Sequence, residues 1–307
     1  MASPFNLDQS VEYGLAVRLA PQVRRLTARN ASPMTFTGTQ TYLVGGGDVA
    51  VIDPGPVNAQ HCADIQAALA PGERVAAILV THTHVDHSPG VAALKAATGA
   101  PTYGFGPHGA GMSGMMKTLA ASGADLGGGE GADRDFAPDH VLNDGDTAEI
   151  GDIRLTAIHT PGHLSNHLSF AMEDGAVFTG DLIMGWATTL VSPPDGDMAA
   201  FIASLQRMRT RAERIYYPGH GHPVEDPIGM IDHQIAHRRA RVDQILDALA
   251  NGPAAPDALT ARIYTDVDPA LHGAAARNVF AALLGLISEN RVAVDGDLSP
   301  SSVFHLI

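Results

Sequence analysis

The residues best suited to chemistry are histidines and aspartates that occur in short motifs. The densest motif, HTHVDH at residues 82–87, contains three imidazoles and one carboxylate within six residues. Single histidines or aspartates also occur in TPGH, TGD and PGHG, whose glycines allow the tight turns that present a side chain. Imidazole nitrogens and carboxylate oxygens are ligands of zinc and similar divalent metals. The motifs therefore predict a metal site with these candidate residues: His82, His84, Asp86, His87, His163, Asp181 and His220.

Such a set of side chains favours hydrolysis by an activated water molecule. Three neutral imidazoles hold one metal with a water, and a second metal, joined by a bridging carboxylate, adds positive charge and orients that water. Coordination lowers the pKa of the water to about 7, which provides hydroxide at neutral pH. The same metals polarise a carbonyl or phosphoryl oxygen, so the reaction needs no side-chain nucleophile.

Each of these motifs follows a segment that is predicted to form a strand. Residues 75–81 (VAAILVT) are a continuous apolar run, typical of a strand covered on both faces, and HTHVDH comes directly after it. TPGH follows a strand predicted at 153–159, and PGHG follows a strand predicted at 215–217. Asp53 comes directly after the apolar run 49–52. Because strands deliver functional loops to the edge of a sheet, we expect these groups to meet there.

Strand and helix patterns alternate through most of the chain. Two β-branched segments flank GGGD at 45–48, which predicts a hairpin. Apolar residues at helical spacing predict an amphipathic helix at 197–212, which Asp197 can cap. The other predicted helices are 59–70, 91–98, 115–121, 227–249, 257–264 and 269–288, and the other predicted strands are 39–44, 49–53, 101–105, 140–142, 147–150, 168–172, 176–179, 292–294 and 303–306.

Two regions stand apart from this alternation. Residues 106–140 contain many glycines and little periodicity, so we interpret them as a mobile insertion, either a lid over the site or a plain surface loop. Near the C-terminus, helical segments are closed by a predicted hairpin. This pattern predicts a small winged-helix-like domain at 233–307 that follows a catalytic domain at 1–232.

The composition excludes several classes of protein. The 307 residues carry a formal net charge of −14, which argues against a protein that grips nucleic acid through its overall field or binds an anionic membrane. The single cysteine, Cys62, forms no intramolecular disulfide. No apolar run is long enough to span a membrane, and the first residues do not resemble a signal peptide. We therefore expect a cytoplasmic protein.

The order and spacing of the motifs over residues 35–225 resemble the metallo-β-lactamase superfamily in its HxHxDH form. The resemblance implies an α/β fold, the αββα sandwich, with a dinuclear site at one sheet edge. It implies that Asp53 orients a ligand or the loop that carries it. Two divalent ions, Zn²⁺ before Fe or Mn, are the implied cofactors. The implied ligands are His82, His84 and His163 for one metal, Asp86, His87 and His220 for the other, and Asp181 as the bridge.

Within the superfamily, the chain is most similar to the β-lactamase-like protein 2 group, whose animal member is an endoribonuclease. Glyoxalase II shares the HxHxDH and bridging-aspartate arrangement. The features shared with the β-lactamase-like protein 2 group are TQTYLVG, HTPGHxxxH, PGHG followed by ED, and a helix with His237 and Arg238 before the C-terminal domain. Two departures matter: Gln40 stands where the group usually has asparagine, and the 106–140 insertion would reshape the substrate pocket.

Two residues are expected to act in the reaction itself. Asp86 would orient the attacking hydroxide or accept its proton while it ligates the second metal. His167, four residues after His163, would contact or protonate the leaving group or support the site from behind. The alternative for His167 is a structural histidine at a strand edge, bonded to backbone.

The favoured function is hydrolysis of a small ester, thioester or lactone at a dinuclear zinc centre, with a small molecule as partner. An endoribonuclease or phosphodiesterase with the same metals is the alternative. An iron-dependent oxygenase ranks lower, because that branch generally binds one iron and every position of the dinuclear set is filled here. Homo-oligomerisation stays open.

Charge in the C-terminal region disfavours the nuclease. Residues 233–307 contain six arginines against eight acidic residues, whereas phosphate contacts need clustered Lys or Arg. The helix predicted at 269–288 offers only His272, Arg277 and Asn278 as polar readers of bases. We therefore expect this domain to pack, dimerise or cover the pocket.

Overall fold

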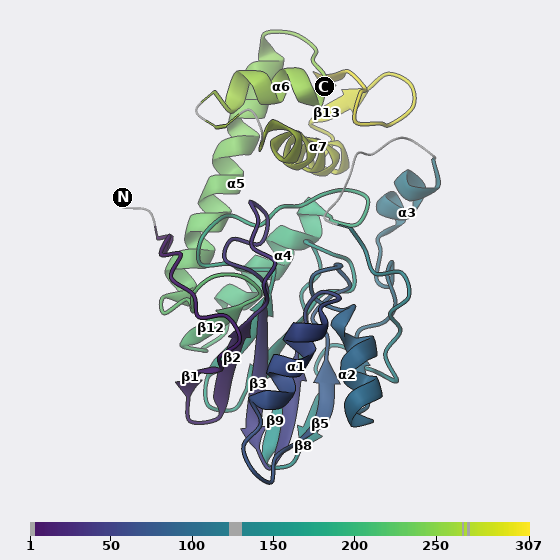
Figure 1. The fold of residues 1–307 in the computed structure, drawn as a ribbon. Coiled ribbons are helices and arrows are strands. Elements are labelled where there is room, and N and C mark those ends of the chain that lie inside the picture. Colours follow the sequence, from purple (N-terminus) through teal and green to yellow (C-terminus); the bar gives the residue numbers. More distant parts are fainter. Residues whose placement is uncertain (1–3, 123–130, 266, 269–270) are drawn as a thin grey trace.

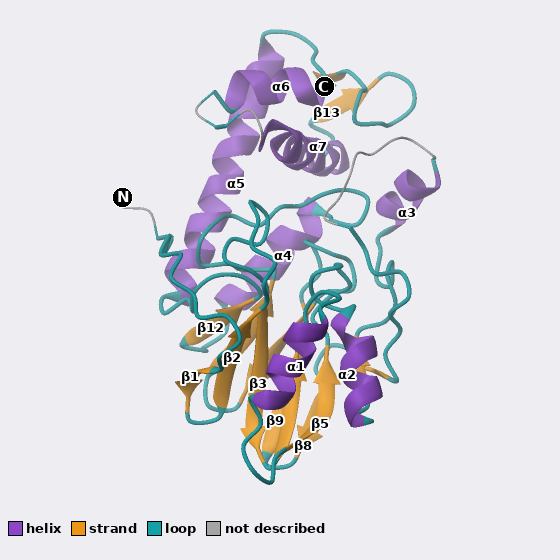
Figure 2. Cartoon of the chain, viewed as in Figure 1, coloured by secondary structure: helices purple, strands orange, loops and turns teal. Residues whose placement is uncertain are grey.

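The computed structural model describes residues 4–122, 131–265, 267–268 and 271–307. The strands of its two large sheets lie in the lower half of the view in Figure 1, and α6, α7 and β13 lie at the top, next to the C-terminus. The long helix α5 (Pro227–Ala250) connects the two regions. Figure 2 shows most strands gathered in one block with helices at its surface, and β13 apart from them at the top.

The first sheet has seven strands in chain order, from β1 to β7. The predicted hairpin forms between β3 and β4, where Gly45 and Gly47 adopt φ angles of +100° and +72° that favour glycine. From β4 onward neighbouring strands pair parallel. The strands are β1 (Val17–Ala20), β2 (Val23–Thr27), β3 (Gln40–Gly46), β4 (Asp48–Ile52), β5 (Arg74–Leu79), β6 (Thr102–Gly104) and β7 (His140–Val141).

The second sheet has five strands in the order β12-β11-β10-β9-β8. All neighbours pair antiparallel except β11 and β12, which pair parallel and are connected through α4 (Met198–Arg209). The strands are β8 (Thr147–Ile150), β9 (Ile153–His159), β10 (Leu168–Met172), β11 (Ala176–Gly180) and β12 (Ile215–Pro218).

Apolar side chains of the two sheets form the central core between them. Tyr42 and Ile52 of the first sheet pack in one buried cluster with Leu155, Phe170 and Phe178 of the second. Period-2 alternation directs these residues to the inner faces, and their burial removes apolar surface from water.

Helices cover both outer faces, which confirms the αββα sandwich. Buried side chains of α1 (Ala59–Ala67) and α2 (Gly90–Thr98) pack on the first sheet. Those of α4 and the first half of α5 pack on the second sheet. The predicted N-cap of α4 is confirmed, because Asp197 accepts hydrogen bonds from the backbone N–H groups of Ala199 and Ala200.

The sequence patterns do not predict β1 and β2. β2 is buried along its whole length, yet it contains two arginines that mask its apolar character. Arg24 is satisfied by the Glu73 carboxylate at 2.8 Å and by the Ala68 carbonyl at 2.9 Å. A partner that is distant in sequence therefore makes this strand possible.

The C-terminal region forms the predicted winged-helix domain. It contains α6 (Pro256–Ile263), α7 (His272–Ser288) and the hairpin of β13 (Val292–Val294) and β14 (Phe304–Leu306). Residues 269–270, the predicted start of α7, lie outside the described residues. The domain boundary at 232/233 stays a prediction, and it falls within α5. No helix among the described residues is long and apolar enough to cross a membrane.

Candidate metal centre

The loops that carry the candidate ligands meet at one end of the sandwich, as the strand-end argument predicts. Asp181 directly follows β11, and Gly219 and His220 follow β12, which pairs with β11. The HTHVDH loop follows β5 in the other sheet. The Leu168 N–H in β10 donates to the Thr81 carbonyl at 2.7 Å, which connects the two sheets beside the site.

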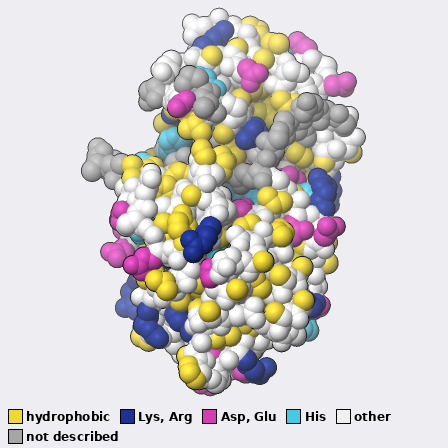
Figure 3. Space-filling model, in the orientation of Figure 1, with side chains coloured by type: hydrophobic (Ala, Val, Ile, Leu, Met, Phe, Trp, Pro, Cys, Tyr) yellow, Lys and Arg dark blue, Asp and Glu magenta, His cyan; other side chains and the backbone are white. Residues whose placement is uncertain are grey.

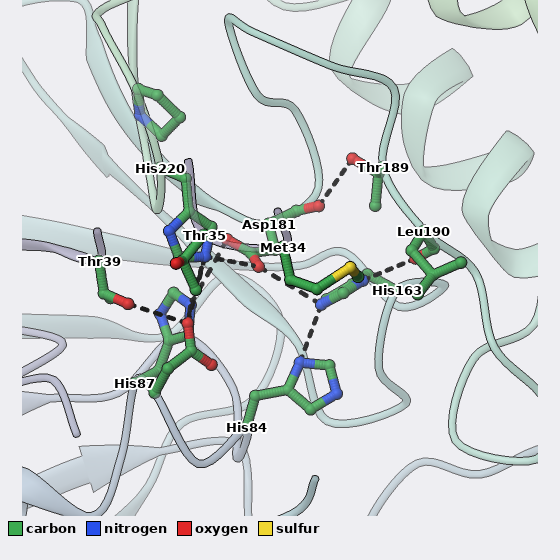
Figure 4. A network of polar contacts seen from close by, with 12 residues as sticks. Met34, Thr35, Thr39, His84, His87, His163, Asp181, Thr189, Leu190 and His220 are labelled. Carbon is green, nitrogen blue, oxygen red and sulfur yellow. Dashed lines mark hydrogen bonds and ion pairs between the residues drawn. The ribbon is translucent and has the colours of Figure 1, made fainter. Parts of the chain in front are cut away.

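His82, His84 and His163 form a first cluster with Asp181 beside them. His84 Nδ1 lies 3.0 Å from His82 Nε2 and 2.9 Å from His163 Nε2, so one nitrogen of each ring faces a common point. Figure 4 shows the contact between His84 and His163. His163 Nδ1 donates to the Leu190 carbonyl at 2.8 Å, which directs its Nε2 into the site.

Asp86, His87 and His220 form a second cluster. His220 Nε2 lies 3.4 Å from His87 Nε2 and 3.3 Å from Asp86 Oδ2. The Thr39 hydroxyl donates to Asp86 Oδ2 at 2.9 Å and fixes the carboxylate from the side of β3.

Asp181 lies between the two clusters. Its Oδ2 is 3.3 Å from His220 Nε2 and 3.5 Å from His163 Nε2, and its Oδ1 is 3.5 Å from His87 Nε2. The buried Oδ1 accepts no hydrogen bond from the described residues. This carboxylate therefore occupies the position of the bridge that the resemblance implies.

The donor types and their spacing fit a pair of divalent cations. Nitrogen ligands about 2.0–2.1 Å from a tetrahedral zinc lie roughly 3.3 Å apart. The separations between converging ring nitrogens are 2.9, 3.0 and 3.4 Å. Buried ring nitrogens need a partner, and a cation at the point where they converge would supply one for all of them. The two clusters are consistent with a dinuclear site, and these ligand types suit zinc, iron and manganese.

Asp53 supports both clusters from behind. Its Oδ2 accepts hydrogen bonds from His87 Nδ1 at 2.9 Å and from the Thr81 hydroxyl at 2.7 Å. The Thr81 hydroxyl oxygen accepts a hydrogen bond from His82 Nδ1 at 2.9 Å. Asp53 thereby directs Nε2 of His87, and through Thr81 that of His82, toward the site. Its φ of +51° lies in the left-handed region, which aspartate adopts more readily than most residues with a side chain.

His167 does not face the ligand set as a proton donor would. Its Nδ1 donates to Thr160 Oγ1 at 2.9 Å, and its Nε2 accepts from the backbone N–H of Asp181 at 3.1 Å. The side chain is fully buried. This geometry argues against the predicted contact with the leaving group, because both nitrogens are engaged. The observed contacts are those of a histidine behind the ligand set that is bonded to backbone, here to the N–H of Asp181.

Two glycines allow the close approach of these groups. A Cβ on Gly180 would lie 2.6 Å from His167 Nε2, and one on Gly219 would lie 2.7 Å from His87 Cε1 and overlap Asp181 Oδ1. These glycines belong to the motifs TGD and PGHG, so the sequence indicated turns here but not the lack of space.

Burial favours the neutral form of His84, whereas carboxylates favour the charged form of His220. Burial, with His163 nearby, lowers the pKa of His84 to about 3. Burial also disfavours the charged form of His220, but Asp181 and Asp86 outweigh it and raise the pKa of His220 to about 10. A ligating imidazole must be neutral, so cation binding at the second cluster displaces protons.

The described part of the 106–140 insertion packs against the site and the C-terminal domain. The Val85 N–H donates to the Gly131 carbonyl at 3.1 Å, and the Asp133 N–H donates to the Thr83 carbonyl at 2.8 Å. α3 (Gly114–Ala121), which confirms the helix predicted there, packs in the core of the C-terminal domain. Residues 123–130 of the insertion lie outside the described residues.

Sequence reasoning missed the residues that position the ligands. Three threonine hydroxyls act in this way. One donates to Asp86 (Thr39), one to the Asp53 carboxylate (Thr81) and one to the Asp181 carbonyl at 2.9 Å (Thr189). The threonine that precedes HTHVDH was visible next to the motif. Thr39 is the first residue of the TQTYLVG motif, although nothing local indicated that it would contact Asp86. Thr189 had no local signal, because only the folded chain brings it to the site.

Comparisons with known proteins agree with this geometry. The profile of the metallo-beta-lactamase superfamily matches residues 34–220, and that of the beta-lactamase associated winged helix domain matches residues 255–300. The "Beta-lactamase-like protein 2 homolog" of Drosophila melanogaster is 31% identical over 90% of this chain and 91% of its own length.

Two further proteins are similar to this chain. An "Atrochrysone carboxyl ACP thioesterase" of Aspergillus fumigatus is 30% identical over 76% of this chain and 66% of that protein. A "Beta-lactamase domain protein" of Burkholderia ambifaria has the same fold, with a TM-score of 0.78 and 20% identity over 99% of this chain and 97% of that one. The family profile, the HxHxDH loop and the two ligand clusters together show that the chain belongs to the metallo-β-lactamase superfamily.

Proposed function

We propose that this chain is a dinuclear metallohydrolase that cleaves a small thioester, ester or lactone. The position of Asp181 between two imidazole clusters carries the proposal, because a carboxylate shared by two cations is the arrangement that activates water for hydrolysis. His82, His84 and His163 would hold one cation with Asp181. Zinc is the expected metal.

Two cations bound there would lower the pKa of a water molecule and polarise the carbonyl of the substrate. Asp86 is the carboxylate nearest to solvent, with its side chain 16% exposed against 4% for Asp181. It is therefore placed to accept a hydrogen bond from the attacking water and orient it. The Thr39 hydroxyl donates to Oδ2 of this carboxylate and holds it in position. Cleavage of a thioester would consume one water and release an acid and a thiol.

An aromatic wall next to His220 supports an acyl substrate. Phe36 stacks on Trp186 with ring centroids 5.0 Å apart and an angle of 11°. Trp186 packs against Gly221, the residue after His220, where a Cβ would lie 3.0 Å from the indole. Phe36 has a φ of +55°, a strained backbone that presents this half-buried ring. An apolar surface of this kind suits the acyl part of a substrate.

The comparison with the fungal thioesterase supports thioesters as the first substrate class to test. The activity in its name is that of the fungal protein, and the chain matches about two thirds of its length. A thioester also needs no basic groove for recognition.

A polyanionic substrate has less support. Asn278, one of three predicted readers on α7, uses its Oδ1 to accept hydrogen bonds from the Val191 N–H at 3.0 Å and from Arg238 at 3.1 Å. Basic side chains on the face in Figure 3 occur at separate places between acidic ones. An extended phosphate backbone needs a continuous basic track.

Metal content and substrate turnover test the proposal together. We expect two zinc ions per chain by elemental analysis of the purified protein. We expect thiol release from short acyl thioesters, and hydrolysis of esters or lactones at other rates. RNA oligomers are assayed beside them.

A matched pair of variants in one loop locates the activity. His220→Gln should lose a metal and most of the turnover, because His220 Nε2 belongs to the second cluster. His222→Gln should keep both, because the His222 ring instead donates to the Asp8 carbonyl at 2.9 Å. Cleavage of RNA alone would favour the nuclease, one iron per chain would favour the oxygenase, and no metal after reconstitution would refute the proposal.

A further inference from the structure

A cavity of about 490 Å³ lies between α4, α5 and α7, on the side of the 189–191 loop away from the ligand clusters. This volume is within the range of small-molecule sites, about 300–1,000 Å³. Apolar side chains of all three helices form most of its wall, among them Met198, Ile235 and Val279. The proposed hydrolysis does not use this cavity.

Arg238 is a buried cation in the wall of the cavity. Its side chain is 5% exposed, and no carboxylate among the described residues pairs with it. Its guanidinium donates to the Thr189 carbonyl and to Asn278 Oδ1, which are neutral acceptors, and its Nε has no hydrogen-bond partner among the described residues. A buried charge without a counter-ion is costly, so a site of this kind favours an anion.

Other charges at the cavity have the same overall sign. Arg239, Arg241 and Arg291 also line it, against Asp243 and Glu289. Glu289 lies 3.4 Å from Arg291 and offsets that charge. Arg239 is exposed and makes no hydrogen bond or ion pair among the described residues, so its guanidinium is available at the mouth of the cavity. This local excess of positive charge occurs in a protein with a net charge of −14.

We propose that this cavity binds an amphiphilic anion, a carboxylate or phosphate on an apolar chain, with Arg238 and Arg239 facing the anionic group and the helix walls enclosing the chain. Guanidinium groups match carboxylates and phosphates through paired N–H donors. The ligand enters from the surface where Arg239 lies, and it does not enter the candidate metal centre.

The walls of the cavity connect to the candidate ligands through the 189–191 loop. Arg238 holds the Thr189 carbonyl, and Asn278 holds the Val191 N–H. Between them, the Leu190 carbonyl accepts from His163 Nδ1 at 2.8 Å (Figure 4). An anion that draws Arg238 toward the cavity changes the loop that orients His163. Occupancy of the cavity therefore alters how tightly the first cluster holds a metal.

Calorimetric titration of the full-length, zinc-loaded protein with decyl phosphate and with decanoate tests the binding site. Decanol lacks the anion, and inorganic phosphate lacks the chain, so both serve as controls. We expect at least one of the two amphiphiles to bind at least ten-fold more tightly than either control. The better of the two identifies the anionic group. Binding of neither amphiphile, or equal binding of decanol, would overturn the proposal.

Three variants locate the ligand. A Cβ on Gly285, which lines the cavity in α7, meets nothing within 4 Å, so Gly285→Leu fills space without disrupting the helix and should weaken binding at least ten-fold. Arg239→Gln should weaken binding several-fold. Arg209→Gln removes an equivalent charge from the end of α4 outside the cavity and should leave binding unchanged. Unchanged affinity in Gly285→Leu contradicts the assigned site, whatever substrates the enzyme hydrolyses.

The rate of zinc transfer to a chelator tests the connection to the metal centre. The amphiphile that binds should change this rate at least two-fold in the wild-type protein. Asn278→Ala, which frees the Val191 N–H, should reduce that change. Binding without any change in zinc transfer would refute the coupling.

Discussion

Asp53→Asn tests whether a single carboxylate sets the direction of the ligating nitrogens. The Oδ1 of Asp53 accepts from the Thr81 N–H at 2.8 Å. Its Oδ2 accepts from the Thr81 hydroxyl at 2.7 Å and from His87 Nδ1 at 2.9 Å. Asparagine has the same size and tolerates a φ of +51°, so the substitution changes charge and hydrogen bonding with little effect on shape.

An amide nitrogen at the place of Oδ2 faces two donors. His87 then bonds to it only through an Nδ1 lone pair, and its proton moves to Nε2. An Nε2 that carries a proton cannot ligate a metal. The opposite amide orientation places the NH₂ group against the Thr81 N–H, which is also a donor. Neither orientation of asparagine therefore reproduces the pattern of the carboxylate.

The expected loss follows from the hydrogen bond that metal binding must break. A hydrogen bond to a charged group contributes about 1.5–3 kcal/mol. Since about 1.4 kcal/mol corresponds to a factor of ten, metal affinity at the second cluster should fall roughly 10- to 100-fold. The first cluster should lose less, because Asp53 reaches His82 only through Thr81.

Competition of zinc-loaded protein with a chromophoric chelator measures both affinities. Asp152→Asn is the matched control, because Asp152 lies exposed in the turn between β8 and β9. We expect one weakened site in Asp53→Asn and two unchanged sites in the control. Two affinities within two-fold of wild type in Asp53→Asn would refute the role of Asp53 in selecting the His87 tautomer.

Three further predictions follow from the same contacts. Gly219→Ala should fold but bind fewer than two metals by elemental analysis, because its Cβ overlaps Asp181 Oδ1; two retained metals would contradict this. Burial lowers the pKa of His61 to about 4, below its usual 6.5, so its neutral form stabilises the fold above pH 6.5 and that contribution is lost as the pH falls toward 4. In urea titrations of the metal-free proteins, the free energy of unfolding of the wild type should fall by about 3 kcal/mol more over this pH range than that of His61→Gln. Equal falls in the two proteins would disprove that His61 is held neutral by burial. Chelation should lower the Tm of the metal-loaded protein, because a metal at 100 times its Kd adds about 2.7 kcal/mol to the free energy of unfolding. The Tm of His220→Gln should fall less on chelation.

Most helices and strands followed from local sequence patterns. VAAILVT predicted the buried β5, and GGGD predicted the turn between β3 and β4. Apolar spacing and Asp197 predicted α4 within a few residues. These features depend on periodicity and turn chemistry that lie within about ten residues of each other. β2 was missed because its arginines are neutralised from elsewhere in the chain.

The candidate site was likewise predicted only in part from the sequence. The motifs named all seven candidate ligands, and the resemblance placed them in the two groups that the structure brings together. His167 shows the limit of that reasoning. Its spacing from His163 suggested chemistry, but which neighbours its two nitrogens contact was decided by Thr160 and by the backbone of Asp181.

The sequence by itself determined the types of candidate ligand and the resemblance to the family, because both depend on residue identity and short spacing, and the resemblance in turn implied the fold. Only the tertiary structure decided which nitrogen of each ring faces the site and how the 189–191 loop is held by Arg238 and Asn278. Those features arise from contacts between residues as much as 182 positions apart, as between His220 Nδ1 and the Gly38 carbonyl. A hydrogen bond depends on distance and direction in space, and a single sequence does not encode either quantity locally.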